Sequence, residues 1–223
     1  MNKPGEGPVR ILVLVSGGGT NLQALLDAEK QGRLGPGKIA LVVSDRGGAY
    51  ALNRAEAAGV PARTETVNPR LSREEGRRDL SDRLLNIVRE EKIGLVVLAG
   101  FLSILAGEFV RAYGGRIINL HPSLLPKYGG PGMYGLRVHR AVLAAGEKES
   151  GCTVHLVDAG TDTGPILLQR KVPVLSGDTA EILAERIHGE EHLALVEATA
   201  LMAEKLKNKG TYSAVGQMSP LGG

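Results

Sequence analysis

The chain has little of several residue types that mark special classes of protein. Its 223 residues include one cysteine, Cys152, no tryptophan and only 3% aromatic residues. A single cysteine cannot form an internal disulfide or supply a cysteine-rich metal site, so we expect Cys152 to be a small buried hydrophobic residue. The scarcity of aromatic side chains leaves few surfaces on which nucleobases could stack.

Long hydrophobic runs are also missing. No stretch approaches the roughly 20 apolar residues that span a bilayer, and residues 1–10 lack the apolar segment of a secretory signal. The formal net charge is only +3, with basic residues interspersed among carboxylates, as in residues 72–79. We therefore expect a cytoplasmic protein that binds small molecules, with neither a membrane nor a nucleic acid as its partner.

Short apolar runs alternate with amphipathic segments along most of the chain. The runs predict strands, and the amphipathic segments predict helices, because apolar residues recur there with helical spacing. This alternation predicts a single α/β domain over residues 1–223, with a mainly parallel twisted sheet and helices on both of its faces, in a Rossmann-like arrangement. Residues 1–8 and 210–223 are expected to be poorly ordered tails. The expected strands are 9–15, 39–43, 62–66, 95–98, 117–120, 153–157 and 166–172, and the expected helices follow residue 20 and span 50–58, 72–92, 105–113, 138–145 and 179–207.

A glycine-rich turn, Ser-Gly-Gly-Gly-Thr-Asn at residues 16–21, joins the first expected strand to the first expected helix. Glycines let backbone N–H groups approach a phosphate, which the helix N-terminus also attracts. Thr20 or Asn21 is the expected cap of the helix. The turn is neither a full dinucleotide fingerprint nor a P-loop, and a merely tight strand-to-helix connection explains the pattern equally well.

A second polar segment, Ile-Asn-Leu-His-Pro-Ser-Leu-Leu-Pro at residues 118–126, ends another buried strand. Asn119 and His121 lie two positions apart, so both side chains point to the same side of the strand. An amide donor and an imidazole in this position can polarise a carbonyl group and stabilise an oxyanion. The alternative is a capping asparagine and a surface histidine. Residues 121–135 are rich in proline and glycine yet partly apolar, which predicts an ordered loop.

Asp162 lies in a turn between two expected strands, Gly-Thr-Asp-Thr-Gly-Pro at residues 160–165. Its carboxylate could reach His121 and raise the pKa of that histidine by favouring the imidazolium form. An aspartate in such a turn also commonly bonds only to the local backbone. His155 is a further candidate, although packing explains a histidine in a strand as well, and His139 and His192 have weaker claims.

Four segments occur in an order and at a spacing typical of one enzyme family. They are Val-Ser-Gly-Gly-Gly-Thr-Asn-Leu-Gln at 15–23, Val-Val-Leu-Ala-Gly-Phe at 96–101, the segment at 118–126 and Asp-Thr-Gly-Pro-Ile-Leu at 162–167. In these segments the chain resembles the folate-dependent glycinamide ribonucleotide formyltransferases over nearly its whole length. The Asn-x-His-Pro-Ser and Asp-x-Gly-Pro motifs are shared by the wider formyltransferase superfamily, whereas the first motif and the short chain favour this member.

The resemblance implies transfer of a formyl group from 10-formyltetrahydrofolate to the amine of N1-(5-phospho-D-ribosyl)glycinamide, a step of de novo purine (IMP) biosynthesis, without a metal. It implies a catalytic trio of Asn119, His121 and Asp162, in which His121 is the general acid and Asp162 tunes it. The substrate phosphate would be held by Gly19, Thr20 and Asn21, and the ribose by Glu191. The residues implied for formyl-folate are Arg73, Leu102, Ser103, Ile104, Leu105 and Asn119.

The chain departs from the family pattern at three places. Ser103 stands where many members have an arginine, which leaves backbone contacts to the folate there. His188 replaces a lysine or glutamine that some members have near the phosphate, and the loop after Pro126 is longer than in the shortest members.

Three alternative functions remain open at this point. Formylation of initiator methionyl-tRNA uses the same core, but such enzymes carry an extra carboxy-terminal RNA-binding domain that we do not expect here. A formyl-folate hydrolase would usually add a regulatory domain. A non-catalytic nucleotide-binding module would use only the glycine-rich turn. A monomer and a homodimer are equally compatible with the sequence.

Overall fold

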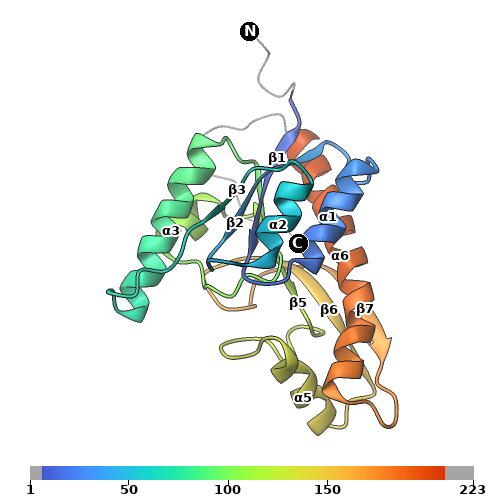
Figure 1. Cartoon of the computed structure of the whole chain (residues 1–223). Helices are drawn as coiled ribbons and strands as arrows, with labels where there is room; N and C mark the ends of the chain where they lie inside the picture. Colours follow the sequence, from blue (N-terminus) through green and yellow to red (C-terminus); the bar gives the residue numbers. More distant parts are fainter. Residues whose placement is uncertain (1–6, 209–223) are drawn as a thin grey trace.

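A seven-stranded sheet runs through the centre of the structure, with the strand order β3-β2-β1-β4-β5-β6-β7 (Figure 1). The computed structural model describes residues 7–208. Strands β1 to β5 pair in parallel, and β6 is antiparallel to both β5 and β7, so the prediction of a mainly parallel sheet is confirmed. The strands are β1 Val9–Val15, β2 Gly37–Ser44, β3 Ala62–Thr64, β4 Leu95–Leu98, β5 Ile117–His121, β6 Glu149–Leu156 and β7 Ile166–Pro173.

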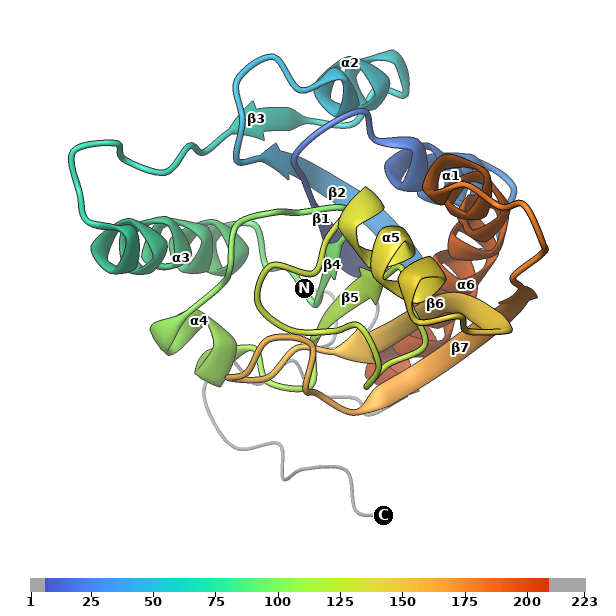
Figure 2. The same cartoon turned by 90° about the horizontal axis from the view of Figure 1, so that it is seen from below.

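Helices cover both faces of the sheet, as Figure 2 shows with α3 and α4 on one side and α1 and α6 on the other. Strand β1 explains this arrangement, because successive side chains of a strand point to opposite faces. Ile11 and Val13 pack in the core cluster under α1 and α6, whereas Leu12 and Leu14 pack in the cluster under α3 and α4. The helices are α1 Thr20–Lys30, α2 Tyr50–Ala57, α3 Arg73–Glu90, α4 Gly107–Ala112, α5 Leu136–Ala144 and α6 Ala180–Asn208.

Helices α3 and α1 begin in different ways. Helix α3 begins with a capping box, in which the Ser72 side chain accepts from the Glu75 backbone and the Glu75 side chain accepts from the Ser72 backbone. Helix α1 follows Gly19, which has a φ of 72°, and no side chain of the described residues caps it. The prediction of Thr20 or Asn21 as the cap is therefore wrong, because a left-handed glycine already turns the chain into the helix.

The carboxyl ends of the parallel strands meet at one edge of the sheet, which faces the viewer in Figure 2. The glycine-rich turn follows β1, residues 99–106 follow β4, and the loop of residues 122–135 follows β5. In open α/β sheets ligands bind at this edge. The tails expected at residues 1–8 and 210–223 lie almost entirely outside the described residues. Within residues 7–208 no helix is long and apolar enough to cross a membrane.

Candidate active site

Four polar side chains, Asn119, His121, His155 and Asp162, form a group that we call the polar cluster. Asn119 and His121 end strand β5, where Asn119 is in register with Leu98, the last residue of β4. His155 lies directly opposite Asn119 on β6. Asp162 reaches the cluster from the loop between β6 and β7. The three residues predicted as a catalytic trio therefore lie together, and His155 joins them.

Asp162 is the centre of the polar cluster. Its Oδ2 lies 3.4 Å from Nδ1 of His121 and accepts a hydrogen bond of 3.0 Å from the backbone N–H of Gly130. Its Oδ1 lies 3.5 Å from Nδ2 of Asn119 and 3.6 Å from Nε2 of His155. The side chain is only 10% exposed. One buried carboxylate thus lies against three side chains and holds the loop that follows β5 through the Gly130 N–H.

His155 holds the amide of Asn119 in place. Its Nδ1 is 2.9 Å from the backbone oxygen of Leu156, which can only accept, so Nδ1 carries the proton. Its Nε2 is then free to accept from Nδ2 of Asn119 at 3.1 Å. The sequence favoured packing for this histidine, and only the pairing of β5 with β6 reveals its contact with Asn119.

His121 is 4% exposed, and both of its ring nitrogens face acceptors. Nε2 lies 2.8 Å from the backbone oxygen of Tyr128, and Nδ1 faces Asp162. Burial lowers the pKa of His121 below its usual 6.5, while Asp162 and the Tyr128 carbonyl raise it. Asp162 raises the pKa in the expected direction, but burial outweighs this contribution, so the net pKa of His121 lies below its usual value.

Asp162 itself stays ionised at neutral pH. Burial alone would raise the pKa of its carboxyl group, but the contacts with His155, His121 and the Gly130 N–H together bring that pKa below its usual 3.8. The cluster therefore offers a fixed negative charge beside the His121 ring. That charge favours any state in which the ring is protonated.

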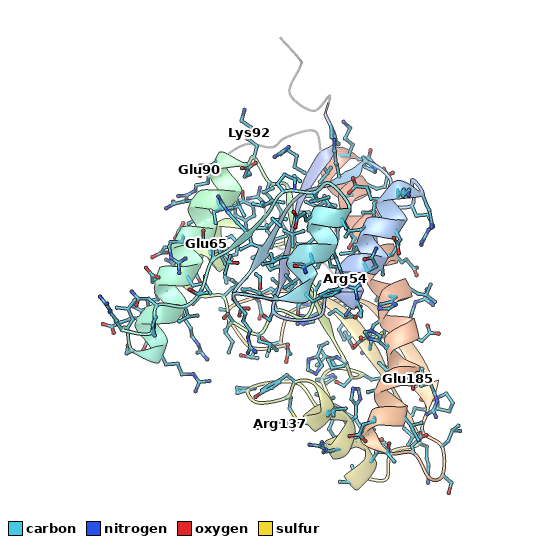
Figure 3. All side chains as sticks on the ribbon, in the orientation of Figure 1. Arg54, Glu65, Glu90, Lys92, Arg137 and Glu185 are labelled. Atoms are coloured by element: carbon cyan, nitrogen blue, oxygen red, sulfur yellow. The ribbon has the colours of Figure 1, made fainter. Side chains whose placement is uncertain are left out.

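The glycine-rich turn leaves donors free for a ligand. No side chain of the described residues caps α1, so the first N–H groups of the helix have no side-chain acceptor there. Oδ1 of Asn21, an acceptor, is also buried and has no hydrogen-bond partner among residues 7–208. Arg54, which Figure 3 labels beside α1, donates from Nε to the backbone oxygen of Gly18 at 2.8 Å. Thr20 also lines a hollow of about 370 Å³ between α1 and α6.

Gly19 is required in this turn for two physical reasons. Its φ of 72° lies in the left-handed region, and a Cβ atom there would come within 2.6 Å of the Cβ of Ala51. The close approach of α2 therefore fixes the shape of the turn.

Glu191, the residue implied for ribose binding, lies on α6 and is 12% exposed. Its Oε2 is 2.9 Å from Nδ1 of His188, and this contact raises the pKa of His188 above its usual 6.5. Glu191 also lies near enough to His121 to contribute to raising its pKa. Helix α6 thus brings a carboxylate and a histidine to the side of the polar cluster.

The residues implied for formyl-folate are divided between two places. Leu102 to Leu105 follow β4, and the Leu102 N–H donates to Oγ of Ser16 at 2.8 Å, which ties this segment to the start of the glycine-rich turn. Oγ of Ser103 donates to Oδ2 of Asp45 at 2.6 Å. Arg73 is the first residue of α3 and is exposed. No contact joins Arg73 to the polar cluster within residues 7–208, so its role stays a prediction.

Two further features of the chain concern metal ligands and its single thiol. Within the part of the chain that the structure describes, no three His, Cys, Asp or Glu residues are placed to hold a metal ion. Cys152 is buried, and burial raises the pKa of its thiol to about 12. A thiol with this pKa is protonated at neutral pH and is a poor nucleophile.

Comparison with known proteins gives a consistent picture. The family model described as formyl transferase matches residues 9–199. Phosphoribosylglycinamide formyltransferase of Escherichia coli is 41% identical over 82% of this chain and 82% of its own length. The trifunctional purine biosynthetic protein adenosine-3 of Drosophila melanogaster is 44% identical over 86% of this chain, which spans only 14% of that longer protein. The crystal structure of glycinamide ribonucleotide transformylase 1 from Symbiobacterium toebii matches with a TM-score of 0.79 and 46% identity, covering 89% of each chain.

Proposed function

The chain belongs to the formyl transferase family, and from this premise we propose that it moves a formyl group from 10-formyltetrahydrofolate to the amine of phosphoribosylglycinamide. The observation that carries the proposal is the meeting of Asn119, His121 and Asp162 at the carboxyl edge of the sheet, the edge that also holds the glycine-rich turn before α1. The turn would bind the anionic part of the substrate, and the three side chains would stabilise the oxyanion of an amide-forming reaction. A single domain in the cytoplasm is proposed to perform the reaction without a metal.

Each end of the acceptor substrate has a suitable partner in this arrangement. The phosphate would lie on the N–H groups of Gly19, Thr20 and Asn21, where the α1 N-terminus favours negative charge. Glu191 would accept hydrogen bonds from the ribose hydroxyls, and His188 would approach the phosphate from α6. The glycinamide amine would then point toward the polar cluster.

Formyl-folate would lie along the segment after β4. Backbone groups of Leu102, Ser103, Ile104 and Leu105 would contact the pterin, and Arg73 would meet the acidic end of the molecule. Asn119 would contact the formyl group itself. Because Oγ of Ser103 is bonded to Asp45, this position contributes through its backbone.

The proposed reaction is a direct transfer in which all atoms balance. The lone pair of the substrate amine attacks the formyl carbon, and the carbonyl electron pair moves to the formyl oxygen. When this tetrahedral intermediate collapses, the bond between the formyl carbon and N10 of the folate breaks. The proton lost by the amine ends on N10, so the products are the N-formyl compound and tetrahydrofolate.

Asn119 and His121 stabilise the oxygen that becomes negative. In the absence of ligands, Nε2 of His121 faces the Tyr128 carbonyl, and a formyl oxygen is an acceptor of the same kind that would replace it. Asp162 favours the imidazolium form as the negative charge develops, which is when a proton donor is needed. Preorganised donors of this type supply a large share of the rate enhancement in acyl transfer.

The first experiment mixes purified protein, a 10-formyl-folate and glycinamide ribonucleotide, and follows release of the deformylated folate by absorbance. Loss of one well-placed oxyanion donor typically costs about 10²–10³ in rate, so Asn119→Ala and His121→Ala should each lower kcat by about this factor. Asn86→Ala, which removes an exposed amide on α3, is the matched control and should keep full activity.

The outcomes separate the competing functions. Turnover that requires the ribonucleotide and is lost in both cluster variants supports the proposal. Tight folate binding without ribonucleotide-dependent turnover would point to a different formyl acceptor. Affinity for phosphate ligands without any formyl transfer would indicate a binding module, and folate deformylation without an acceptor would indicate a hydrolase.

A further inference from the structure

Three consecutive carbonyl groups of the glycine-rich turn are bonded to the protein. The oxygen of Gly17 accepts a hydrogen bond of 3.0 Å from the backbone N–H of Ala51, and the oxygen of Gly18 accepts one of 2.8 Å from Nε of Arg54. The oxygen of Gly19 accepts the first hydrogen bond of α1. Ala51 and Arg54 both belong to α2, so this helix holds two of the three carbonyls (Figure 3).

The N–H groups of the same turn are free. Among residues 7–208, the N–H groups of Gly18, Gly19, Thr20 and Asn21 have no hydrogen-bond acceptor. The peptide bonds of the turn are all trans, and in a trans peptide the C=O group and the following N–H point in opposite directions. The two carbonyls that face α2 therefore direct the N–H groups of Gly18 and Gly19 away from α2, where an anion can reach them.

The peptide between Gly18 and Gly19 depends on Arg54 for its orientation. Rotation of this peptide changes ψ of Gly18 and φ of Gly19, and glycine adopts positive and negative φ almost equally well. Packing does not fix Gly18, which is exposed and would have no atom within 4 Å of an added Cβ. Nε of Arg54 is the one donor to the Gly18 oxygen among residues 7–208. Without this donor, the peptide would be able to turn its oxygen, rather than its N–H, toward a bound phosphate.

Arg54 is itself held by contacts with both helices. Its Nη1 donates to Oε1 of Gln23 on α1 at 3.1 Å, and Nε2 of Gln23 donates in turn to Oδ1 of Asp27 at 3.0 Å. The guanidinium carbon lies 5.1 Å from the centre of the Tyr50 ring, a distance typical of a cation–π contact. A planar guanidinium with several donors can thus connect the turn, α1 and α2 at once.

We propose that Arg54 is a positioning residue that fixes the peptide between Gly18 and Gly19 with its N–H directed at the phosphate of the acceptor substrate. This inference rests on the proposed function, which identifies the anion. Arg54 acts through the turn and touches none of the reacting atoms. Its loss should therefore weaken binding of an acceptor that carries a phosphate and leave the chemical step unaltered.

Two variants separate the hydrogen bond of Arg54 from its charge. In Arg54→Gln, the amide nitrogen is attached to Cδ, as Nε is in arginine, so a donor to the Gly18 oxygen remains. In Arg54→Met, a methyl carbon takes that place and donates nothing. Both variants lack the positive charge, so the difference between them reports the hydrogen bond alone.

The test measures the Kd of glycinamide ribonucleotide by calorimetry without folate, and the steady-state kinetics with it. The Kd and the KM of the ribonucleotide should be about five- to tenfold higher in Arg54→Met than in Arg54→Gln, which is the effect of one hydrogen bond. The kcat and the KM for formyl-folate should be equal in the two variants. Glycinamide riboside, which has no phosphate, should bind equally to both, whereas a general loss of structure would weaken both acceptors.

Arg33→Met is the matched control. Arg33 lines the same hollow of about 370 Å³ as Arg54, but it is exposed beyond the end of α1, and its Nε donates to Oε1 of Gln31. This variant loses the same charge without touching the turn and should bind the ribonucleotide as the unaltered protein does.

Three results would overturn the proposal. They are equal ribonucleotide affinity in Arg54→Met and Arg54→Gln, an equal loss of affinity for the riboside, and an equal loss in Arg33→Met. If the predicted difference in ribonucleotide binding is found but the unaltered protein transfers no formyl group, the role of Arg54 is supported and the proposed function is not. The two failures are therefore distinguishable.

Discussion

The glycine-rich turn is made by one continuous stretch of chain, whereas the polar cluster joins residues as far apart as Asn119 and Asp162, 43 positions along the sequence. Ser16 and Gly18 of the turn accept hydrogen bonds from Leu102 and Arg54. Among residues 7–208, however, Oδ1 of Asn21 has no partner and no side chain caps the start of α1. In the cluster, Asp162 and the ring nitrogens of both histidines all have a partner inside the protein.

Because of this difference, we expect the two regions to bind a substrate in different ways. The turn is preformed and only has to receive an anion. The cluster holds its groups in position by bonding them to one another, so a substrate must replace an internal acceptor such as the Tyr128 carbonyl. We therefore expect changes in the cluster to affect the rate of the chemical step and changes in the turn to affect substrate binding.

Among changes that keep both oxyanion donors, the largest expected effect is that of Asp162→Asn. This change removes the charge that contacts His121 and His155 and leaves the shape of the side chain nearly unaltered. We expect kcat to fall by about 10²-fold, within the range of lost acid–base catalysis. Without Asp162 the pKa of His121 falls further, so the decline in rate at high pH should shift to lower pH.

The pH–rate profile of kcat checks this prediction, with Asp158→Asn as the matched control. Asp158 lies at the start of the same loop and bonds only to the local groups of Gly160 and Thr163. An unchanged profile in Asp162→Asn would remove Asp162 from its proposed role.

A smaller effect is expected for Gly19→Ala in the turn. Alanine strains the left-handed backbone and meets Ala51, which should lower the free energy of unfolding by about 1–3 kcal/mol. The KM for the ribonucleotide should rise more than the KM for the folate. Urea denaturation and steady-state kinetics measure both quantities. Gly18→Ala is the control for stability, because nothing lies within 4 Å of its added Cβ, and equal destabilisation of both variants would contradict the prediction.

The smallest expected effect is on how the free energy of unfolding changes with pH. Burial lowers the pKa of His139, a 4% exposed residue whose Nδ1 has no hydrogen-bond partner in the part of the chain that the structure describes. Below about pH 6.5 the unfolded chain therefore binds a proton more readily than the folded chain, and the free energy of unfolding falls as pH decreases. His139→Gln should make this decline shallower.

His188→Gln tests the opposite sign. Its contact with Glu191 raises the pKa of His188, so this residue adds stability at low pH that is lost as pH rises through its folded pKa. Removing it should make the decline toward low pH steeper. Urea denaturation at pH 5, 6 and 7 measures both variants, and a change of slope in the same direction for both would refute the assignment.

The sequence alone determined the order of strands and helices and the segments that carry the chemistry. Apolar runs such as residues 9–15 are local features of the sequence, and a short, nearly continuous run predicts a buried strand. The glycine-rich turn and the pair of Asn119 and His121 were also visible, because each depends on residues one or two positions apart.

Only the tertiary structure decided how these segments act together. The pairing of β5 with β6 sets His155 opposite Asn119, and the loop from β6 to β7 brings Asp162 to both. Burial, which depends on the whole fold, reverses the expected direction of the pKa of His121. Arg73, Arg77 and Arg78 lie on α3 and Arg111 lies on α4, so only the fold brings Arg111 to the hollow of about 760 Å³ that all four line.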